Sequence, residues 1–398
     1  MTFSEAAKIL NIEAFPDEMD GIYEDLVKSG KVPFDREMLV HLQERFNLFE
    51  DYYEAVLEGY DDLMERDEAR RVWAYTAAAY CKTHERKELT SLKLPETDLT
   101  PAGQMAPLFV LITRAEDAYE EYLRRGFSKE ELAGYMRTYR RSMGVTTHRT
   151  GKPGLQKSHF DWSSLYAFAE MYNRGGFNFA LGFSSPSNYV LMNKATREVL
   201  VLLNGIEMHR DGMPLGSFGY EDEEGSYTVT FEETEDAYVG YPCVEFRCPN
   251  QKQTFSKKEW KLAIAPGDDI FCLHIPRGID ITPPKLREAI HIAREVARES
   301  YPERNIKGIR CTSWLLSPTL NELLGEKSNI SNFSNVFTRY PFRNQGNGVF
   351  SFVFDGKPAD LNDLPEDTSL RRKLKALYLA GGCALNYGGF IIDEEAPV

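Results

Sequence analysis

The chain has 398 residues, of which 42% are apolar and 27% charged, and its formal net charge is −14. This length suggests about two or three domains with cores of their own, and the composition is that of ordinary globular proteins. Because no run of Lys and Arg offsets the acidity, the sequence argues against nucleic acid as a partner.

The cysteines and the hydropathy pattern indicate the cellular compartment in which the protein works. Six cysteines are scattered along the chain without a Cys-x-x-Cys pair, and a chain of this size does not need disulfides. The N-terminal residues show no basic segment followed by an apolar core, and no apolar run reaches about 18 residues. We therefore expect a cytoplasmic protein with free thiols and no membrane partner.

Residues 1–145 are predicted to form a helical domain. Apolar side chains recur at steps of three and four residues, which is typical of an amphipathic helix. This stripe consists of Leu39, Leu42, Phe46, Phe49, Tyr53, Val56, Leu57 and Tyr60. Further on, Gly126 suits the end of one helix, and Ser128 with Glu131 has the spacing of a capping box for the next helix.

The pattern changes at 146–160, where Gly and Pro interrupt the segment TTHRTGKPGLQKSHF. We interpret it as a linker or interdomain loop, followed by a short helix in DWSSLYAFAEMYN. From about residue 177 to about 275, strand-like pieces are separated by Gly, Pro and acidic turns, which predicts a β-rich region.

After this region, helical and strand-like segments alternate. We predict a helix over 283–299, a strand over 306–316, another strand in NGVFSFVFDG, a helix over about 366–380 and a closing strand in CALNYGGFII. This order predicts an α/β domain over 146–398, with a mixed sheet flanked by helices.

Two blocks in this second domain resemble signature segments of a known family. They are HIPRG at 274–278 and CTSWLLSPTLNELLGEKSNISNF at 311–333. With the order of elements, they resemble bacterial N-acyltransferase-like proteins, which pair a helical N-terminal domain with a domain similar to the GCN5-related N-acetyltransferases (GNAT). The resemblance implies an α+β chain with a GNAT-like mixed sheet that transfers an acyl group from acyl-CoA to a small amine.

The resemblance gives a role to the turn after the strand that ends near Ile275. In the GNAT fold, the turn between the fourth strand and the next helix holds the CoA pyrophosphate. Arg277 can pair with a phosphate, Gly278 permits close backbone approach, and Thr282 is a good helix N-cap with a hydroxyl to donate. The candidate cofactor-binding residues are Ile275, Arg277, Gly278, Ile279, Thr282 and Asn329.

The alternative for this turn is a well-capped structural corner. Pro283 and Pro284 would occupy the first two helical positions, where they remove two N–H donors from an anion site. Asp280 would place a carboxylate beside the phosphates. Asn329 has a similar alternative, as the cap of a helix that starts near Ile330.

Acyl transfer to an amine needs few side chains. The amine must lose a proton, the thioester carbonyl needs a hydrogen-bond donor, and the leaving thiolate needs a proton. The candidate catalytic residues are His274, Glu245, Ser313 and Tyr340. We expect His274 or Glu245 near the amine and Ser313 near the thioester; the alternative for His274 is a half-buried strand histidine bonded to backbone.

The segment 211–246 contains ten acidic residues and no Lys, Arg or His. One interpretation is a surface that attracts a polyamine or an aminoglycoside-like amine. The other is a solvated hairpin, which is the commoner role of such a run.

Other functions remain as alternatives. His148, His159 and Asp161 fit no standard spacing of metal ligands, so we expect no metal site. Cys311 with a histidine such as His274 would make a thiol hydrolase, but a strand cysteine is usually a core residue. The main alternative to an enzyme is a non-catalytic binding module that kept the GNAT fold and lost its cofactor.

Overall fold

The computed structural model describes residues 1–96 and 98–392. The chain divides into two compact units, Met1–Tyr172 and Asn173–Val398. The division expected after residue 145 falls inside helix α10 (Thr138–Thr150). This helix and α11 (Lys157–Ala167) belong to the first unit, where the hydroxyls of Ser142 and Ser163 lie 3.0 Å apart.

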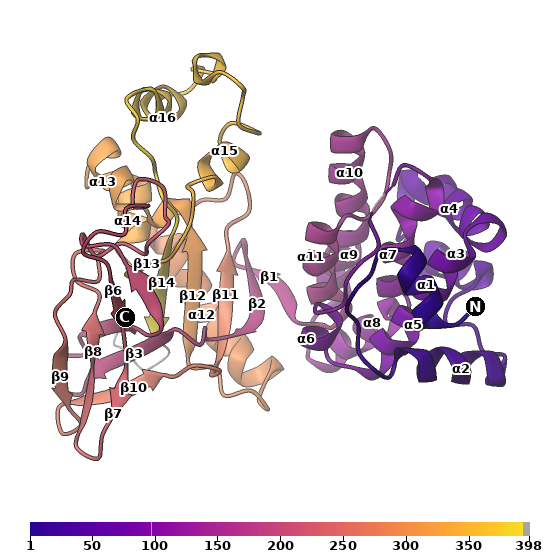
Figure 1. The fold of residues 1–398 in the computed structure, drawn as a ribbon, viewed down its shortest axis with the longest axis horizontal. Coiled ribbons are helices and arrows are strands. Elements are labelled where there is room, and N and C mark those ends of the chain that lie inside the picture. The colour runs from indigo at the N-terminus through magenta and orange to yellow at the C-terminus, as the bar shows by residue number, and fades with distance from the viewer. Residues whose placement is uncertain (97, 393–398) are drawn as a thin grey trace. The chain divides into compact units, whose positions relative to one another are not determined.

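The first unit is built of helices, as predicted. They are α1 (Phe3–Ile9), α2 (Met19–Ser29), α3 (Arg36–Phe46), η1 (Glu50–Tyr52), α4 (Tyr53–Arg66), α5 (Glu68–Thr83), α6 (Arg86–Leu89), α7 (Pro101–Ile112), α8 (Ala115–Arg124), α9 (Lys129–Met136), α10 and α11 (Figure 1). The capping box predicted before α9 is present. The Ser128 hydroxyl accepts a hydrogen bond from the Glu131 amide at 3.2 Å, and the Glu131 carboxylate accepts one from the Ser128 amide at 2.8 Å.

Helix α7 forms the centre of the first unit's core. Every residue from Ala102 to Ile112 is buried, because the segment AGQMAPLFVLI is apolar on nearly all sides. Helices α4, α5 and α11 pack around it. Thr100 caps the helix by accepting a hydrogen bond from the Gly103 amide at 3.0 Å, and Pro101 stands at the first helical position, where its missing N–H costs no bond.

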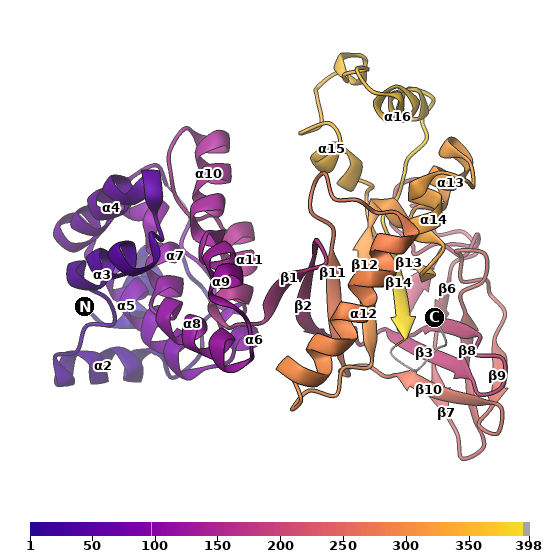
Figure 2. The same ribbon diagram turned by 180° about the vertical axis from the view of Figure 1, so that it is seen from behind.

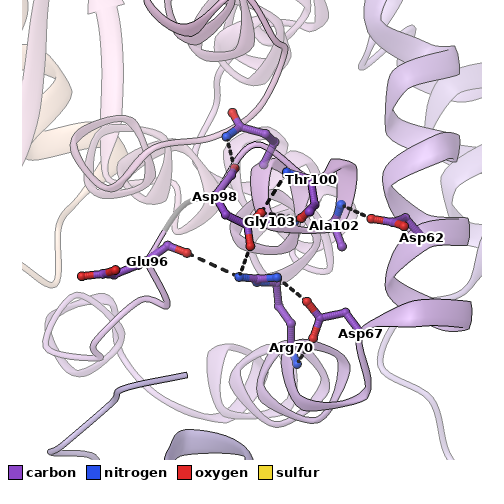
Figure 3. Close-up of polar contacts among 9 residues, drawn as sticks. Asp62, Asp67, Arg70, Glu96, Asp98, Thr100, Ala102 and Gly103 are labelled. Atoms are coloured by element: carbon purple, nitrogen blue, oxygen red, sulfur yellow. Dashed lines mark hydrogen bonds and ion pairs between the residues drawn. The ribbon is translucent and has the colours of Figure 1, made fainter. Parts of the chain in front are cut away.

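A buried arginine ties the start of α5 to the segment that leads into α7 (Figure 3). The Arg70 side chain is 8% exposed, and its guanidinium contacts the carboxylates of Asp67 and Asp98 and the carbonyl of Glu96. The Asp67 carboxylate also accepts a hydrogen bond from the Arg70 amide at 2.9 Å, which caps α5. Asp98 accepts hydrogen bonds from Thr100, the residue that caps α7.

The second unit contains the mixed sheet that the sequence predicted. Its strands follow the order β1 (Met171–Arg174), β2 (Phe177–Phe183), β11 (Asp269–His274), β12 (Gly308–Ser313), β14 (Tyr387–Ile392) and β13 (Thr338–Pro341). Strands β11 and β12 run parallel, whereas β2–β11, β12–β14 and β14–β13 are antiparallel. The crossover between the parallel strands is helix α12 (Pro283–Ser300), which Figure 2 shows beside β11 and β12.

A second sheet covers the other face of the first. Its strands follow the order β10 (Trp260–Ile264), β3 (Asn188–Asn193), β4 (Val199–Leu203), β8 (Ala237–Pro242) and β7 (Glu232–Glu233), with β9 (Gln253–Ser256) beside β8. Strands β5 (Ile206–Met208) and β6 (Tyr227–Val229) pair separately. One apolar core joins Val190 and Val201 of the second sheet to Ile270, Tyr340 and Phe390 of the first.

Short helices fill the rest of the second unit. They are η2 (Trp314–Leu316), α13 (Pro318–Leu324), α14 (Asn329–Ser334), α15 (Gly348–Phe352), η3 (Leu361–Asp363) and α16 (Ser369–Leu379). The strand predicted in NGVFSFVFDG is therefore wrong, since this segment contains α15. Within 1–96 and 98–392, no helix has the length and apolar character needed to span a membrane.

Candidate functional site

Strands β11 and β12 separate at one end of the main sheet. Their parallel ladder ends at the pair Leu273 and Cys311. Beyond it, β11 still pairs with β2 as far as His274, and β12 still pairs with β14 as far as Ser313. Each strand thus stays paired with its outer neighbour for one or two residues after the β11–β12 pairing has ended, directly before the turn that leads to α12.

The turn after β11 presents main-chain N–H groups that the fold does not use. The Ile279 amide donates to the Pro276 carbonyl at 3.4 Å and the Thr282 amide donates to Asp280 at 2.9 Å. Among the residues that the structure describes, none accepts a hydrogen bond from the amides of Arg277, Gly278, Asp280 or Ile281. Gly278 has φ +79°, which is the left-handed conformation that glycine favours.

The end of this turn differs in detail from the expectation. Helix α12 begins at Pro283, and Thr282 stands at the N-cap, but its hydroxyl accepts no hydrogen bond from the amides of the helix. Hydrogen bonds from the amide and the hydroxyl of Thr282 lower the pKa of Asp280. The two prolines leave this helix start with fewer donors, so the available amides are those of the turn itself.

Arg277 is exposed and already has an acidic partner. Its guanidinium donates to Asp355 at 2.6 Å and to the Phe352 carbonyl at 3.0 Å, both in the segment at the end of α15. Asp355 also lies 3.5 Å from Arg371 of α16. Because Arg277 and Asp355 are both more than 60% exposed, a phosphate can replace this carboxylate at little cost.

His274 lies on the face of the sheet that packs against the second sheet. It follows Ile270 and Cys272 at steps of two, and Ile270 belongs to the core between the sheets. Burial and the positive charge of Arg310 lower the pKa of His274 to about 4. The imidazole is therefore neutral at pH 7 and a weak base, which favours the structural role over proton relay.

We expect the protein to lose stability as the pH falls from about 7 to about 5. His274 titrates near 6.5 when unfolded and near 4 when folded, so the unfolded state binds more protons below about pH 6.5. The contribution of the neutral imidazole to the free energy of unfolding is fully present above this pH. It is lost as the pH falls towards the pKa of the folded state. The loss reaches about 2 kcal/mol near pH 5.

Urea unfolding at the two pH values measures this loss, with His274→Gln as the matched variant. The variant should lose less stability than the native protein over the same interval. An equal loss in both proteins would contradict the assignment to His274.

Three other predicted residues have defined places. Ser313 ends β12, and its hydroxyl accepts a hydrogen bond from the Leu315 amide at 3.1 Å. Tyr340 is buried between the sheets, stacks on Phe390 with ring centroids 5.4 Å apart, and has its pKa raised to about 12 by burial. Cys311 is buried and burial raises its pKa far above the usual range, which argues against a thiolate nucleophile.

The helix cap predicted at Asn329 belongs to the preceding residue. Helix α14 begins at Asn329, and its N-cap is Ser328, whose hydroxyl accepts a hydrogen bond from the Ser331 amide at 3.1 Å. The Asn329 side chain is exposed. The cap prediction was one residue off because Ser and Asn are both favoured at this position.

Glu245 lies in a tight turn that opens onto a cavity of about 350 Å³. The lining residues are Phe218, Gly219, Tyr220, Glu245, Phe246, Arg247, Pro318, Thr319, Glu322, Cys383, Leu385 and Tyr387. In the turn, Val244 and Arg247 exchange main-chain hydrogen bonds of 2.8 and 3.0 Å. Glu245 and Phe246 have φ of +48° and +67°, a conformation that costs non-glycine residues of order 1–3 kcal/mol each.

The cavity reaches β14, the strand that pairs with β12. Tyr387 lines it and is the cross-strand partner of Ser313. Glu245 thus lines the cavity and Ser313 pairs with one of its wall residues, whereas Tyr340 lies in the core between the sheets and His274 is partly buried. Sequence reasoning did not find Phe246, Glu322 or Tyr387, and neither turn residue is the Gly or Asn typical of such turns.

The described part of the chain, residues 1–96 and 98–392, gives no evidence of a metal centre. Within these ranges, His, Cys, Asp and Glu form no group of three that could hold an ion. His159 is partly buried and burial lowers its pKa.

Comparisons with known proteins agree with this architecture. The family described as N-acyltransferase N-terminal domain matches residues 37–167, and the family described as GNAT-like C-terminal domain matches residues 213–391. No curated protein matches the chain.

The solved structures similar to the chain include two acyltransferase complexes. One is an acyltransferase mutant in complex with octanoyl-CoA, with a TM-score of 0.63, and another is an acyltransferase in complex with decanoyl-CoA and teicoplanin, with a TM-score of 0.62. Each is 16% identical to this chain, and each comparison covers 98% of this chain and 99% of the other. At this identity the likeness establishes the fold.

Proposed function

The chain belongs to the N-acyltransferase-like proteins, which join a helical N-terminal domain to a GNAT-like C-terminal domain, and from this premise we propose that it transfers an acyl group from acyl-CoA to a small amine. The observation that carries the proposal is the separation of β11 and β12 beside a turn with unused amides. Acyltransferases with the same fold, solved with octanoyl-CoA and decanoyl-CoA, support the choice of donor.

The turn is assigned to the pyrophosphate of the donor. The amides of Gly278, Asp280 and Ile281 supply neutral donors, and Arg277 supplies a charged one once it leaves Asp355. Charge-assisted hydrogen bonds to phosphate are the strong kind. Ile275 and Ile279 flank these groups with partly buried apolar side chains, and Thr282 and Asn329 are proposed as additional polar contacts.

The reaction needs a carbonyl held beside an attacking nitrogen. The amine nitrogen forms a bond to the thioester carbonyl carbon, the carbon–sulfur bond breaks, and the proton lost by the nitrogen leaves to a base while the thiolate takes up a proton. We assign Ser313 to the thioester and Glu245 to the amine. His274 and Tyr340 receive no proton-transfer step, because their pKa values of about 4 and about 12 are far from neutrality.

Calorimetric titration with octanoyl-CoA tests the donor assignment directly. We expect saturable binding below millimolar concentration, followed by release of CoA thiol when a primary amine is added. Absence of binding by the native protein at millimolar octanoyl-CoA would contradict the proposal. Binding without thiol release across a panel of primary amines would instead support the non-catalytic binding module.

A further inference from the structure

We propose that the cavity beside Glu245 binds the acceptor, and that this acceptor carries a primary ammonium group on a ring-shaped body. The inference rests on the proposed function for the reaction and on the cavity for the chemistry of the ligand. The cavity lies among the loop 218–220, the turn 245–247, helix α13 and the start of β14, and its volume of about 350 Å³ suits a small molecule.

Two carboxylates of the cavity have no cationic partner. Glu245 and Glu322 both line it, both are exposed, and neither forms an ion pair with a residue of the described chain. Elsewhere in the acidic segment, by contrast, Asp222 pairs with Arg210 at 2.8 Å, and Glu232 pairs with Lys252 at 2.6 Å. Part of the acidic charge thus serves the fold. At the cavity, Arg247 sets one positive charge against the two carboxylates, but it donates to the Asp211 carbonyl and the Tyr220 hydroxyl, so both carboxylates remain available for a cationic ligand.

Four aromatic residues form the other walls of the cavity: Phe218, Tyr220, Phe246 and Tyr387. Phe218 is 40% exposed, which leaves apolar surface for a ligand to cover. The rings of Tyr220 and Phe246 are fixed by arginines. Arg247 lies 5.7 Å from the Tyr220 ring and donates to its hydroxyl at 3.3 Å, and Arg339 lies 4.0 Å above the Phe246 ring. Flat rings held in place favour a ligand with a ring of its own, and aromatic faces also attract an ammonium group.

The position of the cavity suits an acceptor. Its wall residue Tyr387 pairs with Ser313, the last residue of β12, and β12 is one of the two strands that separate. An amine bound there lies one strand away from the opening that we assign to the thioester. Glu322 comes from α13, which follows β12 after η2, and Glu245 comes from the turn after β8 of the second sheet.

Binding of tyramine to the full chain, measured by calorimetry without any CoA present, tests the inference. We expect 2-(4-hydroxyphenyl)ethanol, which has the same ring and no ammonium, to bind at least about tenfold more weakly. Glu245→Gln and Glu322→Gln should each weaken tyramine binding about three- to fivefold, and the double variant about tenfold, with a smaller dependence on salt. Glu326→Gln is the matched control, because Glu326 is exposed just after α13 and does not line the cavity.

Equal binding of tyramine by the native protein, both single variants and the Glu326 variant would overturn the inference, as would absence of tyramine binding. Octanoyl-CoA titrations of the same proteins separate this failure from a failure of the proposed function. If octanoyl-CoA binds and the carboxylate variants leave tyramine binding unchanged, only the acceptor site is wrong. If octanoyl-CoA does not bind, the reaction is wrong, while the effect of the two carboxylates on tyramine still decides the site.

Discussion

Replacing Arg277 with alanine is expected to weaken the binding of octanoyl-CoA about tenfold or more. Hydrogen bonds to charged groups contribute about 1.5–3 kcal/mol, and Arg277 is the cation of the turn in which four amides have no partner in the described chain. Calorimetry at fixed salt measures the change. Arg298→Ala is the control, because Arg298 is also exposed but lies in the last turn of α12, at the opposite end from the phosphate turn.

Replacing the partner of Arg277 is expected to have the opposite effect on octanoyl-CoA binding. Asp355 competes with phosphate for the guanidinium, so Asp355→Asn should tighten octanoyl-CoA binding about two- to threefold, as expected for loss of an exposed ion pair. If Arg277→Ala and Arg298→Ala bind octanoyl-CoA equally well, the turn does not hold the pyrophosphate.

Replacing Arg70 with methionine is expected to destabilise the protein by about 3 kcal/mol. The arginine is 8% exposed and touches two carboxylates and a carbonyl, and removal of one partner from a buried ion pair costs about 3–5 kcal/mol. The lower end of this range applies because the Asp98 side chain is 48% exposed, so its carboxylate can be hydrated once the arginine is gone. Urea unfolding measures the loss.

Arg66→Met is the matched control for this prediction. Arg66 also contacts a carboxylate, that of Asp62 at 3.1 Å, but its side chain is 73% exposed. Such a pair contributes about 0–1 kcal/mol. If both variants lost the same stability, burial of Arg70 would not be the cause.

Local signals in the sequence predicted the helical unit well. Leu39 and Leu42 of the predicted stripe are buried in α3 and Val56 is buried in α4. Ser128 caps α9 as expected, because caps and apolar periodicity act within a few residues. The prediction of a strand in NGVFSFVFDG was wrong because tertiary packing decides the structure of this segment. Val349 and Phe350 of α15 are both buried in a core shared with Leu374 and Tyr378 of α16, and such packing overrides the preference of a short apolar segment.

The candidate site was predictable where it is local and not where it is assembled from distant segments. The turn with Gly278 follows directly from the order strand, turn and helix. The cavity does not, because Tyr220, Glu322 and Tyr387 come from segments far apart in the chain. Glu245 was found as an acidic residue, but the turn that presents it carries Glu and Phe where a hairpin signal would be Asn or Gly.

The position of β14 in the main sheet has a consequence for biosynthesis. This strand is the last one that the structure describes, yet it lies between β12 and β13 and pairs with both. The helical unit has a core of its own and can fold while the ribosome is still at work. The sheet cannot close until residue 392 has emerged, so the growing polypeptide carries open strand edges that chaperones or neighbouring nascent chains can engage.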